Sequence, residues 1–189
     1  MELYETNNYI DDLFPVGIYQ VTPYQCIPHG RGYRDLHWHE ELQYVLVLKG
    51  NVTFQVNGID YHLKENDVLF INKSILHVST SMSSDSCYIS LNFPEKLLDF
   101  YPNSRIHYKY VSPYTDSYQL TAFQFNDSFI SEQLLSIYSL FNQSNKEYDL
   151  SLSILQLWKS SIQYFKKLEL TGNIKLHNQQ ERMQSMLNY

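Results

Sequence analysis

Two histidines, His37 and His39, lie two residues apart just before an apolar run from Leu42 to Leu48. Side chains of a strand point alternately to its two faces, so we expect His37, His39, Glu41 and Gln43 to share one face. Imidazole rings can donate or accept hydrogen bonds and bind metal ions. On a strand rich in Val and Leu they should point to an interior, either as hydrogen-bonded core groups or as the lining of a cavity.

Other polar residues can complete such a cavity. Tyr33 and Arg34 precede the strand, where they could close a pocket over an anion or a sugar, or equally be ordinary loop residues. On a later strand, Tyr88, Ser90 and Asn92 alternate with apolar neighbours, and we favour this polar set as cavity lining. The predicted effector pocket comprises His37, His39, Gln43, His77, Arg34 and Tyr88.

The first two thirds of the chain consist of short β-branched and aromatic segments separated by polar turns. Asn57-Gly58 is typical of a two-residue hairpin, because both residues tolerate the positive φ that a type I′ turn requires. Regularly spaced short strands favour a sandwich or a barrel. The predicted strands cover residues 16–22, 42–48, 51–63, 67–71 and 87–93.

After residue 93 the apolar pattern changes to a helical period. Asp127 or Ser128 can cap a first long helix, and Gly172 can end a second. A short polar loop between the two makes them antiparallel neighbours. The expected elements are a short helix over 94–101, an irregular stretch over 103–126 and amphipathic helices over 128–141 and 151–169.

The second long helix has an apolar face wider than one neighbouring helix needs to cover. Such a face either packs on the β-domain or forms an interface. We expect it to join two copies about a two-fold axis, with each residue meeting its counterpart. The residues predicted to make this dimer contact are Leu155, Trp158, Ile162 and Phe165.

Residues 177–189 have the pattern of a third helix, with Asn178 as its cap and Met183, Met186 and Leu187 on its apolar face. No capping residue or polar tail follows. We therefore expect the natural chain to continue into a further domain.

The composition excludes several classes of protein. The chain has 20 acidic and 14 basic side chains, a net charge of −6 and scattered bases, so alone it is a poor nucleic-acid binder. The N-terminus lacks the pattern of a signal peptide, and no apolar run approaches the roughly 20 residues that span a membrane. We expect a cytoplasmic protein with Cys26 and Cys87 as reduced thiols, although the sequence leaves open that they are neighbours.

Residues 36–77 resemble the N-terminal cupin-type sensor domain of AraC-family transcription regulators. The shared elements are a His-x-His-Glu-Glu strand, a strand ending in glycine, an Asn-Gly hairpin, the turn before "DVLFIN" and a final histidine. The resemblance implies an α+β fold, a cupin-like double-stranded β-barrel (jelly roll) followed by an antiparallel helical pair. It also implies a homodimer that binds a small effector, such as a sugar or a small acid, and that needs no cofactor.

The same resemblance implies that promoter DNA is bound only through a C-terminal helix-turn-helix domain absent from these residues. The chain then divides into a sensor barrel with its short helix (1–126), a helical dimerisation segment (127–172) and a linker that starts the missing domain (173–189). The effector is expected to stabilise one arrangement of these parts, and so to change how paired DNA-binding domains meet their half-sites.

Cupin enzymes resemble the same segment and supply the alternative hypothesis, a metal-dependent enzyme. Their metal set is a His-x-His, a carboxylate and a later histidine, which matches His37, His39, Gln43 and His77. Gln43 lacks the charge that balances a divalent ion, although three imidazoles still form a feasible triad for zinc, nickel or iron. Neither a phosphate-binding glycine loop nor a nucleophile elbow is present. We therefore expect neither a bound metal nor catalysis.

Overall fold

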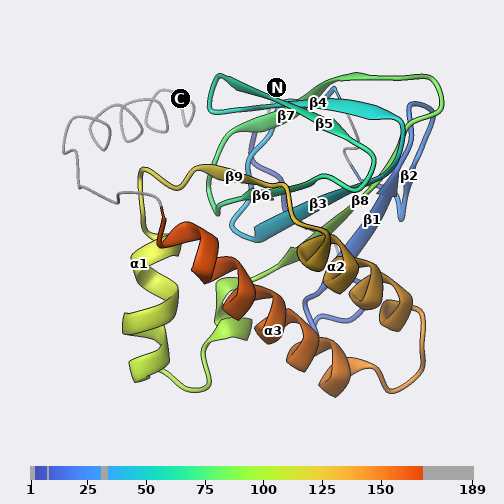
Figure 1. The fold of residues 1–189 in the computed structure, drawn as a ribbon. Coiled ribbons are helices and arrows are strands. Elements are labelled where there is room, and N and C mark those ends of the chain that lie inside the picture. The colour runs from blue at the N-terminus through green and yellow to red at the C-terminus, as the bar shows by residue number, and fades with distance from the viewer. Residues whose placement is uncertain (1–2, 8, 31–33, 168–189) are drawn as a thin grey trace.

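The computed structural model describes residues 3–7, 9–30 and 34–167, which form two antiparallel sheets and a helical layer (Figure 1). One sheet has the strand order β2-β1-β8-β3-β6-β9, and the smaller sheet has the order β5-β4-β7. The helices cover the face of the larger sheet that points away from the smaller one. The strands are β1 (Gly17–Val21), β2 (Cys26–Ile27), β3 (Leu42–Lys49), β4 (Asn51–Val56), β5 (Ile59–Lys64), β6 (Val68–Ile71), β7 (His77–Met82), β8 (Cys87–Phe93) and β9 (Ala122–Phe125).

The hairpin between β4 and β5 has the predicted turn. Val56 pairs with Ile59, and the two residues between them, Asn57 and Gly58, have φ values of 49° and 80°. These are the positive angles that a type I′ turn needs. The hairpin prediction is therefore confirmed, including its register.

Strand β3 is buried on both faces, as its apolar run predicts. Its side chains alternate between two cores. Tyr44 and Leu46 pack in the core between the larger sheet and the helices, whereas Val45 and Val47 pack in the core between the two sheets. The strand thus separates the two cores, and a shift of β3 changes the packing in both of them.

The two sheets face each other, but they do not close into a barrel. Among the described residues no strand ladder joins their edges, and a single bridge between His37 and His77 links β7 to the segment before β3. Bends at Glu40 and Glu41 interrupt this pairing before β3 begins. The mixed helix and strand class with antiparallel sheets is confirmed, whereas the two sheets of the predicted double-stranded β-barrel (jelly roll) are not closed in this structure.

The two long helices follow the predicted order. Helix α2 (Ser128–Phe141) has the predicted bounds, and the Asp127 side chain caps it by accepting a hydrogen bond of 2.8 Å from the N–H of Phe129. Helix α3 (Glu147–Phe165) begins before residue 151 and packs against α2. Neither of them, nor any other helix in the described part of the chain, has the length and apolarity to cross a membrane. The predicted stop at Gly172 and the predicted helix over 177–189 lie outside the described residues.

The stretch between β8 and α2 has more regular structure than the sequence predicts. The predicted helix over 94–101 is reduced to one short turn, and a stretch expected to be irregular contains helical residues and a strand. Strand β9 forms because it pairs with β6, a partner far away in sequence, so local pattern could not reveal it. The elements are a 3₁₀ turn (Glu95–Leu98), a π-helical turn (His107–Val111), helix α1 (Ser112–Thr115) and β9.

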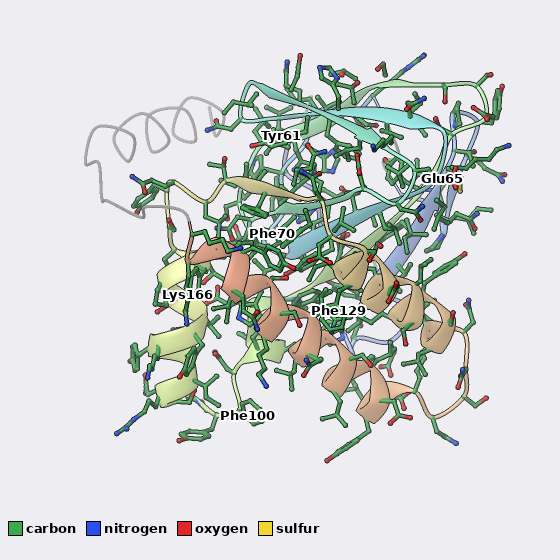
Figure 2. The ribbon with its side chains drawn as sticks, in the orientation of Figure 1. Tyr61, Glu65, Phe70, Phe100, Phe129 and Lys166 are labelled. Atoms are coloured by element: carbon green, nitrogen blue, oxygen red, sulfur yellow. The ribbon has the colours of Figure 1, made fainter. Side chains whose placement is uncertain are left out.

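An aromatic core joins the larger sheet to α3, and Figure 2 shows Phe70 at this boundary. The Phe70 ring centroid lies 5.9 Å from that of Trp158 and 5.1 Å from that of Phe165. Trp158, Ile162 and Phe165 are 3%, 6% and 0% exposed. These three residues are core residues of their own chain, so assigning them to a dimer contact is wrong. The apolar face is wide because it covers the sheet as well as α2.

Candidate functional site

Three histidine rings meet at the edge of the space between the two sheets. His37, His39 and His77 are 8%, 1% and 1% exposed. The ring centroid of His77 lies 4.4 Å from that of His37 and 5.1 Å from that of His39. The backbone bridge explains this proximity, because the N–H of each of His37 and His77 donates to the carbonyl of the other, at 3.1 and 2.9 Å. The structure therefore brings together the three histidines that the sequence singles out.

Backbone carbonyls orient two of these rings. The Nδ1 atom of His37 lies 2.6 Å from the Asp35 carbonyl, and that of His77 lies 2.7 Å from the Ile75 carbonyl. A carbonyl oxygen can only accept, so both Nδ1 atoms carry the proton and donate it. In a neutral ring this leaves Nε2 as an acceptor. Within the described part of the chain, Nε2 of His77 is buried and has no hydrogen-bond partner.

The protein interior favours the uncharged form of the two more deeply buried rings. Burial, together with the neighbouring His37, lowers the pKa of His39 to about 4. The pKa of His77 is also lowered, by burial first and by His37 and His39 next. Both rings are therefore neutral at pH 7, with lone pairs available to a donor or a cation.

Gln43 begins a chain of hydrogen bonds along the larger sheet. Its Nε2 donates to Ser90 Oγ at 2.6 Å, and Ser90 Oγ donates to Asn92 Oδ1 at 2.8 Å. Asn92 Nδ2 donates in turn to Asn7 Oδ1 at 3.2 Å. The amide oxygen of Gln43 is buried and has no partner among the described residues. Gln43 thus presents a second buried acceptor on the wall of the cavity that His77 also lines.

The polar face of β8 lines the cavity, as expected. Tyr88, Ser90 and Asn92 all lie on its wall, and the Tyr88 ring packs edge-on against Phe54 at a centroid distance of 5.3 Å. Burial raises the pKa of the Tyr88 hydroxyl above its usual range. Whether these residues contact an effector stays a prediction.

Two other predicted pocket residues are placed differently. Arg34 is exposed, has a φ of 71° and is not among the residues that line the cavity. Its backbone N–H donates to the Ser79 carbonyl at 3.2 Å, and its assignment to the effector pocket stays a prediction. His39 contacts the other two rings without lining the cavity itself. Tyr33 lies outside the described residues.

The N-terminal segment, residues 3–7, closes one side of the cavity, which sequence reasoning missed. It pairs with Trp38, whose N–H donates to the Leu3 carbonyl and whose carbonyl accepts from the Glu5 N–H, both at 2.9 Å. The Tyr4 and Trp38 rings lie 4.7 Å apart. Glu5 and Asn7 consequently line the cavity. The only sequence signal is that Leu3, Glu5 and Asn7 would share one face of an extended segment.

Carboxylates hold this segment against the histidines. Glu5 Oε2 lies 3.2 Å from Nε2 of His37, and Glu41 Oε2 lies 3.4 Å from Nδ1 of His39. Asn7 Nδ2 and the Tyr9 hydroxyl each donate to the Glu41 carboxylate at 2.6 Å. Glu41 is therefore a structural anchor for the N-terminal segment.

The cavity is small. It offers about 40 Å³ to the centre of a water-sized sphere. A water molecule needs roughly 10–15 Å³ by this measure, so the space holds about three. Pockets for drug-sized ligands measure roughly 300–1,000 Å³. A sugar-sized molecule therefore enters only if residues that line the cavity move.

The solved structures that match this chain include ToxT and a predicted oxalate decarboxylase. An apo ToxT variant from Vibrio cholerae strain SCE256 matches with a TM-score of 0.53 and 13% identity, over 84% of this chain and 59% of that chain. This likeness shows the fold alone. A predicted oxalate decarboxylase from Thermotoga maritima matches 42% of this chain and 64% of its own, at 21% identity and a TM-score of 0.33. A match over so small a part of the chain supports no inference about chemistry.

Sequence comparisons are more specific. The chain is 33% identical over 185 residues to the uncharacterized HTH-type transcriptional regulator YdeC of Bacillus subtilis (strain 168). The match covers 93% of this chain and 60% of that relative, so the chain spans about three fifths of the relative's length. The profile of the AraC-like ligand binding domain matches residues 20–157. The chain therefore belongs to the family of AraC-like ligand binding domains.

Proposed function

We propose that this chain is the effector-binding part of a transcription regulator and that its effector occupies the cavity beside His77 and Gln43. The observation that carries this proposal is a pair of buried acceptors, Nε2 of His77 and Oε1 of Gln43, which have no hydrogen-bond partner within residues 3–7, 9–30 and 34–167. Leaving a buried acceptor unpaired costs roughly 1–3 kcal/mol, which a bound donor recovers. The pocket thus favours an effector with hydroxyl or amine donors, such as a sugar, over an ionised acid.

Effector entry requires the N-terminal segment to move. Glu5 and Asn7 occupy one side of the cavity, and the remaining space holds only about three waters. Displacing these two side chains enlarges the cavity without disturbing either sheet. An effector that binds only the displaced arrangement shifts the population toward it, by an amount set by its differential affinity.

Strand β3 offers a direct route from the cavity to the helices. Gln43 faces the cavity, and its neighbour Tyr44 faces the helical layer, where its hydroxyl donates to Ser161 Oγ of α3 at 2.9 Å. A small displacement of β3 by the effector is therefore transmitted to α3. In the whole regulator, we propose, α3 leads toward a helix-turn-helix domain that binds promoter DNA.

Dimerisation belongs to the same proposal, through a different face of α3 than the sequence predicts. Tyr148 and Leu152 are 77% and 53% exposed, and Leu155 is half-buried. Their spacing places them on one stripe of the helix. We propose that this stripe meets its counterpart in a second copy. Sedimentation at tens of micromolar tests this: Leu152→Asp should shift a dimer to monomer, whereas Ile59→Asp, an exposed residue of β5, should not.

A thermal-shift screen tests the effector site. A panel of pentoses, hexoses, polyols, amines and small carboxylic acids is added separately to the purified chain, because a ligand that binds only the folded state raises its melting temperature. Donor-rich compounds are expected to give the largest shifts. Shifts given only by carboxylates would contradict the acceptor-based argument.

A metal-dependent enzyme is the second candidate function, which the histidine triad favours. Its three imidazoles lie within reach of one ion, but Gln43 supplies no charge. Turnover of small carboxylic acids by metal-supplemented protein, abolished by His37→Ala, would establish it. Binding without turnover would leave the sensor proposal in place.

A further inference from the structure

We propose that the cavity between the two sheets binds a small primary ammonium ion, the protonated form of a short alkylamine. The inference rests on the proposed effector site and narrows its ligand from donor-bearing compounds in general to one chemical class. It is carried by the hydrogen-bonding groups that the cavity wall leaves unpaired, by the charge of that wall and by the space inside it.

A carboxylate that does not itself line the cavity sets the direction of the hydrogen-bond chain that ends at Gln43. The Glu41 carboxylate can only accept, so Asn7 must turn Nδ2 toward it and Oδ1 toward Asn92. Asn92 therefore presents Nδ2 to Asn7 and Oδ1 to the Ser90 hydroxyl, which donates to it. Ser90 Oγ is left to accept from Gln43 Nε2. The amide oxygen of Gln43 is consequently the atom left without a partner among the described residues.

The cavity wall thus uses its amide donors within the protein and leaves acceptors for a ligand. The side-chain amides of Asn7, Gln43 and Asn92 each donate to a neighbouring protein group. On the same wall, Nε2 of His77 has no partner in the described part of the chain, because Nδ1 carries the proton and donates it to a backbone carbonyl. A primary ammonium group complements such a wall, since it has three N–H donors and no acceptor. An alcohol has one donor and brings lone pairs that need donors in return.

The charge of the wall favours a cation over a neutral ligand. Glu5 lines the cavity, and the lining residues that the structure describes include neither Lys nor Arg. His77 adds no positive charge at pH 7, because burial lowers its pKa. Oε2 of Glu5 lies 3.2 Å from Nε2 of His37. A carboxylate has about four acceptor sites, so this contact leaves it able to accept from a ligand as well.

Aromatic side chains supply a surface for the alkyl part of the amine. Tyr19, Phe54 and Tyr88 line the cavity, and the rings of Phe54 and Tyr88 pack edge-on at a centroid distance of 5.3 Å. Aromatic rings pack against alkyl carbons and attract a nearby ammonium group through their electron-rich faces. The wall therefore offers both parts of an alkylammonium ion a matching surface.

The space inside the cavity suits a ligand of about three non-hydrogen atoms, because it holds about three waters. Ethylammonium has this size. Once it has entered, it is enclosed with Glu5 and Asn7 in the positions seen here, whereas a sugar needs both side chains to be displaced. The same two residues therefore close the cavity over a small amine and exclude a larger ligand.

Titration of the chain with ethylammonium chloride at constant ionic strength, followed by NMR of the histidine rings, tests the proposal. Ethanol and formate are the matched neutral and anionic probes, since each also has three non-hydrogen atoms. A ligand of this size binds weakly, so we expect a dissociation constant for ethylammonium in the millimolar range. It should bind at least about tenfold tighter than ethanol and shift the Nε2 signal of His77, whereas formate should not bind.

Two variants test the groups that select the charge. Glu5→Gln should weaken ethylammonium binding at least about tenfold and leave ethanol binding unchanged. Glu65→Gln removes the same charge at an exposed position away from the cavity wall and should bind like the wild type. Glu41→Gln frees the hydrogen-bond chain to reverse, because an amide can donate as well as accept, and should reduce the preference for ethylammonium over ethanol. Circular dichroism checks that each variant is folded.

The outcomes separate this proposal from the effector site on which it rests. Equal affinities for ethylammonium and ethanol, or tighter binding of formate, would overturn the ammonium assignment but leave an effector in the cavity. Absence of saturable ethylammonium binding up to about 50 mM, well above the expected range, would also overturn it. The effector site itself would fail only if the sugars, polyols and acids of the thermal-shift screen gave no shift either. Ethylammonium binding that Glu5→Gln leaves unchanged would contradict the recognition of its charge in this cavity.

Discussion

The hydroxyl of Tyr44 donates a hydrogen bond of 2.9 Å to Ser161 Oγ, which joins β3, one of the two central strands of the larger sheet, to helix α3. Both residues are fully buried. Ser161 Oγ in turn donates to the Leu157 carbonyl, so it stays satisfied as a donor when Tyr44 is changed. The two ends of this contact therefore respond differently to mutation.

We predict that Ser161→Ala destabilises the protein more than Tyr44→Phe does. Tyr44→Phe removes one hydrogen bond, worth about 1 kcal/mol. Ser161→Ala leaves the buried Tyr44 hydroxyl without its acceptor, at a cost of roughly 1–3 kcal/mol. Urea unfolding measures both. The double variant should resemble Tyr44→Phe rather than the sum of the two. A larger loss of stability in Tyr44→Phe than in Ser161→Ala would contradict this hydrogen bond.

Trp158→Ala is predicted to lower the stability of each chain rather than to separate two chains. Trp158 packs on Phe70, and its Nε1–H donates to the Tyr110 carbonyl at 2.8 Å. Truncating such a residue costs about 3–5 kcal/mol. Thermal unfolding measures the loss, and sedimentation at a temperature where the variant is folded should match the wild type. A variant that is as stable as the wild type but monomeric would show instead that Trp158 lies at a dimer interface.

Alkaline pH should destabilise the fold. Burial raises the pKa of Tyr44 and of Tyr88 above the ordinary value of 10.0. In the unfolded chain these hydroxyls lose their protons near pH 10, but in the folded chain they keep them. Stability is therefore fully present below pH 10 and falls as the pH rises above it, by up to about 1.4 kcal/mol per pH unit for each tyrosine.

The urea midpoint measured from pH 8 to about 11 tests this pH dependence. Tyr44→Phe should make the decline less steep, because one of the linked protons is gone. Tyr148→Phe, at an exposed tyrosine, serves as the control and should decline like the wild type. A midpoint that stays constant with pH would show that these hydroxyls ionise equally in both states.

The tautomer of His77 can be measured directly. The Ile75 carbonyl accepts from Nδ1, so we predict a neutral ring with its proton on Nδ1 and a bare Nε2 at pH 7. Long-range proton–nitrogen spectra of the histidine rings in metal-free protein distinguish the two nitrogens. A proton on Nε2 would remove the acceptor from the proposed effector site.

Local pattern predicts the parts of the fold that local chemistry determines. The β4–β5 hairpin follows from Asn57-Gly58, and the start of α2 follows from Asp127 and the apolar stripe behind it. Strand β9 was not predicted, because it forms only by pairing with β6. Trp158 was assigned to a dimer contact but lies in the core, for a related reason. Periodicity shows that Trp158 lies on an apolar face, but it cannot show which surface that face covers.

The candidate site shows the same contrast between features that local pattern predicts and features that depend on distant contacts. The His-x-His spacing predicts that His37 and His39 share a face, and the bridge between His37 and His77 brings the third ring beside them. The approach of Glu5 could not be predicted, since it depends on pairing between residues 3–5 and Trp38 in a segment without a clear period. Arg34 was placed near the pocket from its position just before the strand, and its exposed, left-handed backbone conformation could not be predicted from that position.

The central claim is that the acceptors of Gln43 and His77 bind the effector, and calorimetric titration of the strongest compound from the screen tests it most directly. Gln43→Leu removes one acceptor while leaving the site of similar size, and Gln55→Leu makes the same change on β4, where Gln55 Nε2 donates to Asp60 at 3.0 Å. We predict that Gln43→Leu lowers the affinity at least about tenfold, the equivalent of 1.4 kcal/mol, while Gln55→Leu binds like the wild type. Equal affinity of the wild type and Gln43→Leu would contradict the account.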